Sequence, residues 1–269
     1  MIKEITSTQN PFIKNIVLLA AKSRERKQQG LFVAEGWREV GLALKNGYEA
    51  EALLYDSSQT REEPIQALAR QATLPVKEVI AVNAPVFEKI AYRSGVPNVV
   101  AVLKEKIHAP KSIIFQKTPL LLVLESIEKP GNLGAILRTA DAAAVDAVVV
   151  CDPLADPYNP NAIRASLGAV FTVPVLVLPP EEAVSWLQEK NIRLLSTWLE
   201  AATPLYQCDL CQPTAFVLGA EANGISRFWV EQANERIIIP MAGQVDSLNV
   251  AASAAVVLFE AVRQRSLKP

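Results

Sequence analysis

Hydrophobic residues in the first hundred positions follow two alternating spacings, one typical of helices and one typical of strands. Trp37, Val40, Gly41 and Leu44 stand at i, i+3, i+4 and i+7, which is the apolar stripe of an amphipathic helix. The same reasoning predicts helices at 13–20, 37–44, 61–72 and 85–92, and strands at 31–34, 50–55, 76–80 and 98–103. Alternating strands and helices predict a layered α/β unit and argue against a helical bundle.

The second half repeats this pattern with more apolar strands. Residues 120–124 form an unbroken apolar run, as expected for a strand that is buried on both faces of a parallel sheet. Further strands are predicted at 147–151, 215–218 and 236–240, and helices at 133–144 and 250–265. Polar, glycine-containing loops follow three of these strands, and such loops meet at the sheet edge where open α/β folds bind ligands.

A lysine-rich stretch punctuated by Pro110 separates the two halves. We therefore predict an N-terminal domain at 1–105, a linker at 106–118 and a second domain at 119–269.

The composition indicates that the chain can bury a substantial hydrophobic core. Half of its 269 residues are hydrophobic and 20% are charged. No apolar run approaches the ~18 residues of a membrane span, and the polar N-terminal segment does not resemble a signal peptide. We expect a cytoplasmic protein with no membrane association.

The scarcity of histidine narrows the possible chemistry. A Ser-His-Asp or Cys-His hydrolase would have to use His108, which lies in the predicted linker. Cys208 and Cys211 offer two of the about four ligands that a zinc site needs, so we expect buried thiols and no metal. None of the strand-end loops carries a dinucleotide-binding or phosphate-loop motif, which disfavours dehydrogenases and NTPases.

Charge is distributed unevenly along the chain. Residues 1–117 hold 17 basic and 12 acidic side chains, whereas residues 118–269 hold 10 and 16. The basic side chains of the first half are concentrated in one polar stretch that contains Lys14, Lys22, Arg24, Arg26 and Lys27. Such a stretch suits a polyanion, because lysine and arginine release counterions when they neutralise phosphates, but a solvated helix face has the same composition.

The loop before the helix at 133–144, and the helix itself, each contain a polar residue that can bind a ligand. Asn132 is a favoured helix-capping residue, and its amide can also bind a sugar or a base. Arg138 lies about 9 Å along the helix axis from the turn, at ~1.5 Å per residue, in a small and apolar segment. Its guanidinium needs a partner, either Asp141 in an ion pair or a ligand.

Two further polar loops stand downstream. In the first, the carboxylate of Glu221 stands between Gly219 and Gly224, and Ser226 can cap the next helix. In the second, Ser247 and Asn249 precede the apolar helix at 250–265.

These three loops carry a family resemblance. Residues 132–140, 218–226 and 239–250 are similar, in order, to the three motifs of the SpoU (TrmH-type) branch of the SPOUT RNA methyltransferases. The similarity extends over about 119–265. The first hundred residues resemble the substrate-binding domain that precedes the catalytic domain in many members, notably at 10–14 and 32–36.

The resemblance implies a fold and a reaction. The fold is the SPOUT α/β knot, a mainly parallel sheet with a deep trefoil knot, preceded by a smaller α/β ribosomal-protein-like RNA-binding domain. The reaction is methylation of a ribose 2'-hydroxyl in structured RNA, with S-adenosyl-L-methionine (AdoMet) as cofactor. The resemblance also implies a homodimer, although the helix at 250–265 is equally consistent with a core helix.

The resemblance assigns site residues as well. Backbone groups of the knot loops would hold AdoMet, which maps onto Gly219, Ile239 and Leu248, and the neighbouring loop residues Leu218 and Met241 would line the site. Substrate positioning and catalysis fall to Asn132, Arg138, Glu221, Ser247 and Asn249. The resemblance implies that Arg138 takes the proton of the 2'-hydroxyl, but a guanidinium group is a poor base. Two roles therefore stay open for Arg138: the base itself, or an anchor for the adjacent phosphate.

Three alternatives remain open at this stage. Ribosomal RNA is favoured over tRNA as substrate, because the full-length N-terminal domain resembles that of rRNA-modifying members. A methyltransferase acting on a base is disfavoured by the motifs at 132–138 and 247–249. A non-catalytic RNA-binding or assembly protein is disfavoured because every catalytic position is kept.

Overall fold

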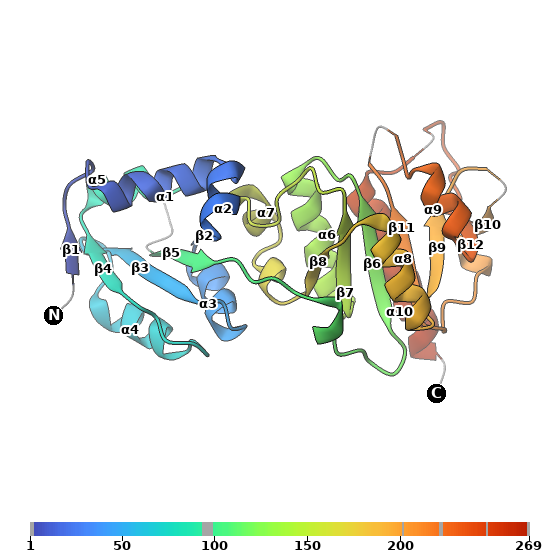
Figure 1. Ribbon diagram of the computed structural model, residues 1–269, viewed down its shortest axis with the longest axis horizontal. Helices are drawn as coiled ribbons and strands as arrows, with labels where there is room; N and C mark the ends of the chain where they lie inside the picture. The colour runs from blue at the N-terminus through green and yellow to red at the C-terminus, as the bar shows by residue number, and fades with distance from the viewer. Residues whose placement is uncertain (1–2, 93–98, 201, 221–222, 246, 268–269) are drawn as a thin grey trace. The chain divides into compact units, whose positions relative to one another are not determined.

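The chain forms two compact units, each built on its own sheet (Figure 1). The computed structural model describes residues 3–92, 99–200, 202–220, 223–245 and 247–267. The first unit consists of residues 1–106 together with 156–172, and the second of residues 107–155 together with 173–269. The excursion 156–172 thus interrupts the chain of the second unit and folds as part of the first.

The first unit is a mixed five-stranded sheet with helices on both faces. Its strands are β1 (Lys3–Ile5), β2 (Leu31–Glu35), β3 (Ala50–Asp56), β4 (Val79–Val82) and β5 (Val99–Lys104), in the order β1-β4-β3-β5-β2. Its helices are α1 (Pro11–Ala21), α2 (Ser23–Gln29), α3 (Trp37–Lys45), α4 (Glu62–Arg70), α5 (Ala84–Ile90) and α7 (Pro160–Ala165), with a 3-10 turn, η2, at Ala169–Phe171. The predicted layered α/β unit is confirmed.

Side-chain alternation along these strands explains both layers. Val100 and Val102 of β5 point into a core with Ile13 and Ile16 of α1 and with Phe87 of α5, and all five residues are buried. The basic stretch after α1 forms a separate helix, since Lys22 has extended backbone angles (φ −123°, ψ 116°) that break the helical path.

The second unit is a seven-stranded sheet in which every neighbouring pair is parallel. Its strands are β6 (Leu120–Glu125), β7 (Ala147–Cys151), β8 (Val175–Val177), β9 (Arg193–Thr197), β10 (Thr203–Pro204), β11 (Thr214–Leu218) and β12 (Glu235–Ile238), in the order β10-β12-β9-β11-β6-β7-β8. Its helices are α6 (Pro130–Ala142), α8 (Pro180–Glu189), α9 (Arg227–Gln232) and α10 (Val250–Leu267), with 3-10 turns η1 (Pro110–Ser112) and η3 (Leu205–Gln207). The predicted mainly parallel sheet is confirmed.

Two layers of helices bury this sheet. Leu121 and Val123 of β6 point to the face covered by α8 and α9, where they share a core with Trp186 and Trp229. The intervening Leu122 is equally buried, on the face where α6 and α10 pack together. Burial on both faces accounts for the unbroken apolar run at 120–124.

Strand order sets the position of a ligand site. The chain lays down β6, β7 and β8 in one direction, and β11 later inserts between β6 and β9. Strand order therefore reverses beside β6 and β11, and open α/β sheets bind ligands beyond the carboxyl ends of strands at such a reversal.

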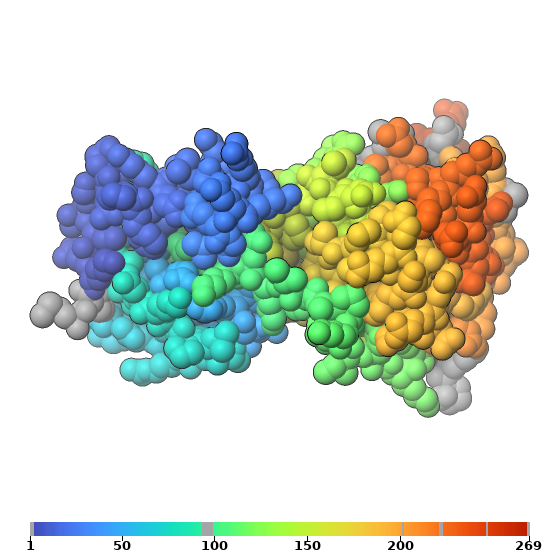
Figure 2. Space-filling view, viewed as in Figure 1, coloured from blue at the N-terminus to red at the C-terminus, as the bar shows by residue number. Residues whose placement is uncertain are grey.

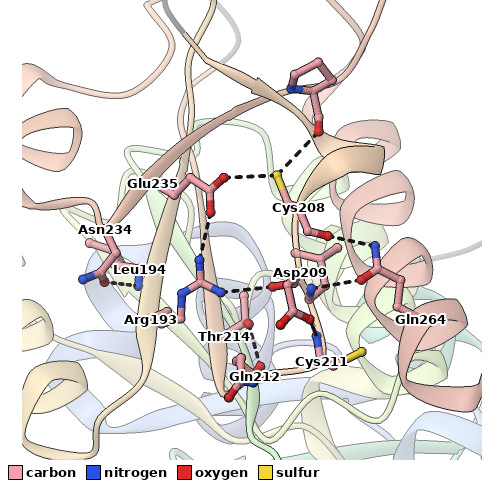
Figure 3. A network of polar contacts seen from close by, with 12 residues as sticks. Arg193, Leu194, Cys208, Asp209, Cys211, Gln212, Thr214, Asn234, Glu235 and Gln264 are labelled. Carbon is pink, nitrogen blue, oxygen red and sulfur yellow. Dashed lines mark hydrogen bonds and ion pairs between the residues drawn. The ribbon is translucent and has the colours of Figure 1, made fainter. Parts of the chain in front are cut away.

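A polar network holds the end of α10 against the opposite, amino edge of the sheet (Figure 3). Gln264 donates to the carbonyl of Cys208 at 3.1 Å and accepts from the backbone N–H of Leu210 at 3.0 Å. Beside it, Arg193 pairs with Glu235 at 2.8 Å. Burial and the neighbouring Glu235 raise the pKa of the Cys208 thiol to about 12, so this sulfur stays protonated and packs as a neutral group. With one end of α10 fixed here, its first turn is held at the carboxyl edge.

Among the described helices, none combines the length and the apolarity that a membrane span requires.

Candidate active site

A pocket of about 480 Å³ opens at the carboxyl edge of the second sheet. Its walls come from the segments that follow β9, β11 and β12 and from the first turn of α10. All five residues that the sequence assigned to the cofactor line it, namely Leu218, Gly219, Ile239, Met241 and Leu248. The end of β11 and the stretch between β12 and α10 therefore meet in one cavity, and the predicted Ser247 lies in its wall as well.

Gly219 is required by the turn itself. A Cβ built on this residue would lie 2.0 Å from the carbonyl oxygen of Gly224 and 2.4 Å from the nitrogen of Ile225. Gly224 donates its N–H to Ala220 at 2.8 Å, which closes the turn. The close approach that demands glycine here is thus between two parts of the chain.

Asn132 and Asn249 join the first turn of α6 to the start of α10. The Nδ2 of Asn249 donates to the Oδ1 of Asn132 at 3.4 Å, and the Oδ1 of Asn249 accepts from the N–H of Ala251 at 3.0 Å. The prediction that Asn132 caps its helix is wrong, because α6 begins two residues earlier at Pro130, with Lys129 as the capping residue. Proline starts the helix there, since its fixed φ suits the first helical position and it has no N–H to leave unpaired.

Arg138 lies on the exposed face of α6 and does not line the pocket. Within the part of the chain that the structure describes, it forms no ion pair with Asp141, the structural partner considered from the sequence. Its guanidinium therefore faces solvent on the helix that carries Asn132.

Glu221 lies outside the described residues. Sequence reasoning missed a buried carboxylate beside this motif. Glu125, at the end of β6, accepts from the N–H of Ser226 at 2.6 Å. Ser226 occupies the capping position of α9, but its side chain makes no capping hydrogen bond.

Sequence reasoning also missed one wall of the pocket. Thr197 ends β9, Trp198 and Glu200 follow it, and Ser253 lies in the first turn of α10. The sequence signal was weak, because only Leu194 and Leu195 of β9 are apolar. It carried no motif, and only the strand order shows that this loop reaches the same edge as the other two.

The basic stretch divides into exposed and buried members. Lys14, Lys22, Arg24 and Lys27 are exposed on α1, α2 and the residue between them, and both helices contribute to the molecular surface in Figure 2. Arg26 is 1% exposed; its Nε pairs with Asp156 at 2.6 Å and its NH1 donates to the carbonyl of Leu19 at 2.6 Å. The assignment of Arg26 to RNA binding is therefore wrong, because its guanidinium is buried and already paired.

Comparison with known proteins gives matches over both units. The SpoU rRNA Methylase family matches residues 119–259, and the MRM3-like substrate binding domain matches residues 10–101. The 23S rRNA (uridine(2479)-2'-O)-methyltransferase of Streptomyces viridochromogenes is 30% identical over 98% of this chain and 93% of its own. The 23S rRNA (guanosine-2'-O-)-methyltransferase RlmB of Bordetella pertussis is 34% identical over 87% of this chain and 97% of its own.

A solved structure agrees over nearly the whole chain. The SpoU methyltransferase AviRb from Streptomyces viridochromogenes, in complex with the cofactor AdoMet, aligns with a TM-score of 0.88 at 29% identity. The alignment covers 97% of this chain and 100% of that one.

Proposed function

The chain belongs to the SpoU rRNA methylase family, and from that premise we propose that it methylates a ribose 2'-hydroxyl of ribosomal RNA with AdoMet as methyl donor. One observation carries the proposal: the five residues assigned to the cofactor come from two separate segments, the end of β11 and the stretch between β12 and α10, and line a single pocket. The relatives named above act on 23S rRNA, which supports ribosomal RNA over tRNA.

The volume of the pocket suits a small-molecule cofactor such as AdoMet. Its volume of about 480 Å³ falls within the ~300–1,000 Å³ typical of pockets for small ligands. Leu218, Gly219 and Ile239 would hold AdoMet at the strand ends, with Met241 and Leu248 closing over it from the exposed loop before α10. When bound, AdoMet supplies a methyl group already activated by a sulfonium centre.

The remaining task of the protein is to hold the 2'-hydroxyl in line and to manage its proton. Asn132 and Asn249 link the start of α6 to the start of α10, and Ser247, two residues before Asn249, lines the pocket. Arg138 is free to contact RNA, either taking the proton at the 2'-oxygen or neutralising the neighbouring phosphate. Its exposure favours the phosphate anchor, because a solvated guanidinium keeps its charge.

The first unit is the proposed RNA-recognition domain. Lys14, Lys22, Arg24 and Lys27 present exposed positive charge that can neutralise phosphates. We also propose a cytoplasmic homodimer with α10 at its interface, where Phe259 is 47% exposed and large enough to bury against a second copy. The deep trefoil knot remains a prediction.

Methylation of purified RNA tests the function. The full chain is incubated with isotopically labelled AdoMet and, separately, unmodified large-subunit rRNA, small-subunit rRNA and tRNA, and the products are mapped by nuclease digestion and mass spectrometry. We expect a single 2'-O-methylated nucleotide in ribosomal RNA, formed ~100-fold or more slowly by Arg138→Ala. Label in tRNA or on a base would contradict the proposed substrate, and AdoMet binding without transfer to any RNA would contradict the activity.

A further inference from the structure

A second cavity, of about 210 Å³, lies within the first unit. It is formed where β2 ends and α3 begins, and residues of α5 and α7 complete its walls. None of the residues assigned to AdoMet, to catalysis or to the basic stretch lines it. Its volume is below the ~300–1,000 Å³ of pockets that enclose a whole cofactor-sized ligand, so it suits a smaller planar group.

Two aromatic side chains border this cavity with their rings partly in solvent. Trp37 is 37% exposed and Tyr92 is 52% exposed, and both line the cavity. Among the described residues, neither ring contacts another aromatic ring or a cation. Other rings of the same unit are packed together, as Phe32 and Tyr158 show with their centroids 4.3 Å apart. The two rings at the cavity therefore keep π-faces that a flat ligand can cover.

The charged groups around the cavity disfavour an anion inside it. Two acidic residues, Glu35 and Glu39, and one basic residue, Arg164, line the walls, and one carboxylate oxygen of Glu35 accepts from the backbone N–H of Tyr92. Carboxylates repel phosphate but accept hydrogen bonds from amino groups. A neutral ring that carries an amino group fits this lining better than a phosphate does.

Glu39 does not make the helix-capping hydrogen bond that is common for a glutamate at its position. It is the third residue of α3, where a glutamate commonly accepts from the backbone N–H of the capping residue. Here the capping residue is Gly36, and its N–H donates instead to the carbonyl of Val99 at 3.1 Å. The carboxylate of Glu39 is thereby left to face the cavity.

We propose that this cavity binds one unstacked base of the RNA substrate, stacked on Trp37 and Tyr92 and recognised through its exocyclic amino group by Glu39. The choice of RNA rests on the proposed function. Proteins that read RNA in sequence take splayed-out bases onto aromatic side chains, and a carboxylate accepts from the amino group of cytosine. Arg164, which is exposed, is placed to contact the backbone beside that base. Cytosine binds here in preference to uracil, which has a carbonyl in place of the amino group.

Binding of oligocytidylate and oligouridylate to the full chain tests this assignment without requiring catalysis. The wild-type protein should bind oligocytidylate about 10-fold more tightly than oligouridylate, and Glu39→Gln should remove most of this difference. Trp37→Leu and Tyr92→Leu should each weaken binding of oligocytidylate about 10-fold, because stacking is lost, whereas Trp37→Phe should stay within about 3-fold of wild type. Tyr206→Leu, which removes an aromatic ring that is 59% exposed in the second unit, is the matched control and should bind as wild type does.

Several outcomes would overturn the proposal. They are equal affinity for the two oligonucleotides, unchanged binding by Trp37→Leu, and equal losses in Trp37→Leu and Trp37→Phe. The proposal would also be overturned if Trp37→Leu or Tyr92→Leu changed the molecular mass of the protein in solution but left its RNA affinity unchanged, because the cavity would then be a contact between proteins. AdoMet affinity, measured in parallel, should be the same in all variants and shows that the second unit is folded, and hydrogen exchange of β2, α3 and β5 at the wild-type rate shows that the first unit is folded. If the wild type discriminates the oligonucleotides but methylates no RNA, the proposed function fails and the base site stands. If it methylates rRNA without discriminating the oligonucleotides, the proposed function stands and the base site fails.

Discussion

Replacing Asp156 with alanine is expected to destabilise the first unit by about 3 to 5 kcal/mol, the cost of leaving a buried charge without its partner. The side chain of Arg26 is 1% exposed and that of Asp156 is 11% exposed, and Nε and Oδ2 are 2.6 Å apart. Asp156→Ala removes the counter-charge while the guanidinium remains bonded to the carbonyl of Leu19 at 2.6 Å. It cannot easily swing into water.

Two further contacts add to this cost. The carboxylate of Asp156 accepts from Ser23 Oγ at 3.2 Å and from the N–H of Tyr158 at 2.9 Å. Each hydrogen bond contributes about 1 kcal/mol. The matched control is Glu78→Ala, which breaks a pair with Lys3 at 2.9 Å whose side chains are 48% and 55% exposed. Exposed pairs contribute only ~0 to 1 kcal/mol, so the control should be nearly neutral.

Hydrogen exchange read by mass spectrometry is the suitable assay, because the two units can unfold separately and a single melting curve would mix them. Asp156→Ala should accelerate exchange in α2 and in 156–172 while leaving the second unit unchanged. The reasoning fails if the variant is no less stable than Glu78→Ala.

The same contacts separate Arg26 from its exposed neighbour. Arg24→Ala should leave stability unchanged and lower the slope of log affinity against log salt by ~0.7 to 0.9, the value for one lost phosphate contact. Arg26→Ala should instead destabilise the first unit. A lowered slope for a fully stable Arg26→Ala would reverse our correction and return this residue to the RNA surface.

Three other predictions concern the second unit. Arg138→Ala should lower single-turnover methylation ~100-fold or more, while AdoMet affinity stays the same and stability changes by less than ~0.5 kcal/mol; near-normal turnover on rRNA would remove Arg138 from the reaction. Gly219→Ala should abolish AdoMet binding in calorimetry, because its Cβ would overlap the facing backbone, whereas Gly243→Ala, where a Cβ meets nothing within 4 Å, should bind normally; equal affinities would show that the turn relaxes freely. Cys208 has a pKa of about 12 when folded against ~8.5 when unfolded, so its contribution to stability is full below about pH 8.5 and declines as pH rises toward 12; Cys208→Ser should flatten that decline in urea unfolding at alkaline pH, and an unchanged pH profile would assign it to other groups.

Much of this protein is determined by local pattern. The unbroken apolar run at 120–124 indicated a strand buried on both faces, and β6 has that environment. The polar loops that follow the strands predict one ligand edge, because parallel strands place their carboxyl ends together, and residues of the second and third loops line one pocket. Such features could be predicted because side-chain periodicity and strand direction are properties of short segments.

Other features depend on which distant segments touch. Arg26 and Arg24 stand in the same polar stretch, yet one is buried, because 156–172 folds onto the first unit and brings Asp156 to it. Gly219 is needed because the backbone at Gly224 folds back against it, and the residues after β9 reach the pocket only through the strand order. Sequence establishes what each segment prefers by itself. Tertiary structure decides which charges lose their water and which side chains share a cavity, because both depend on contacts between residues far apart in the chain.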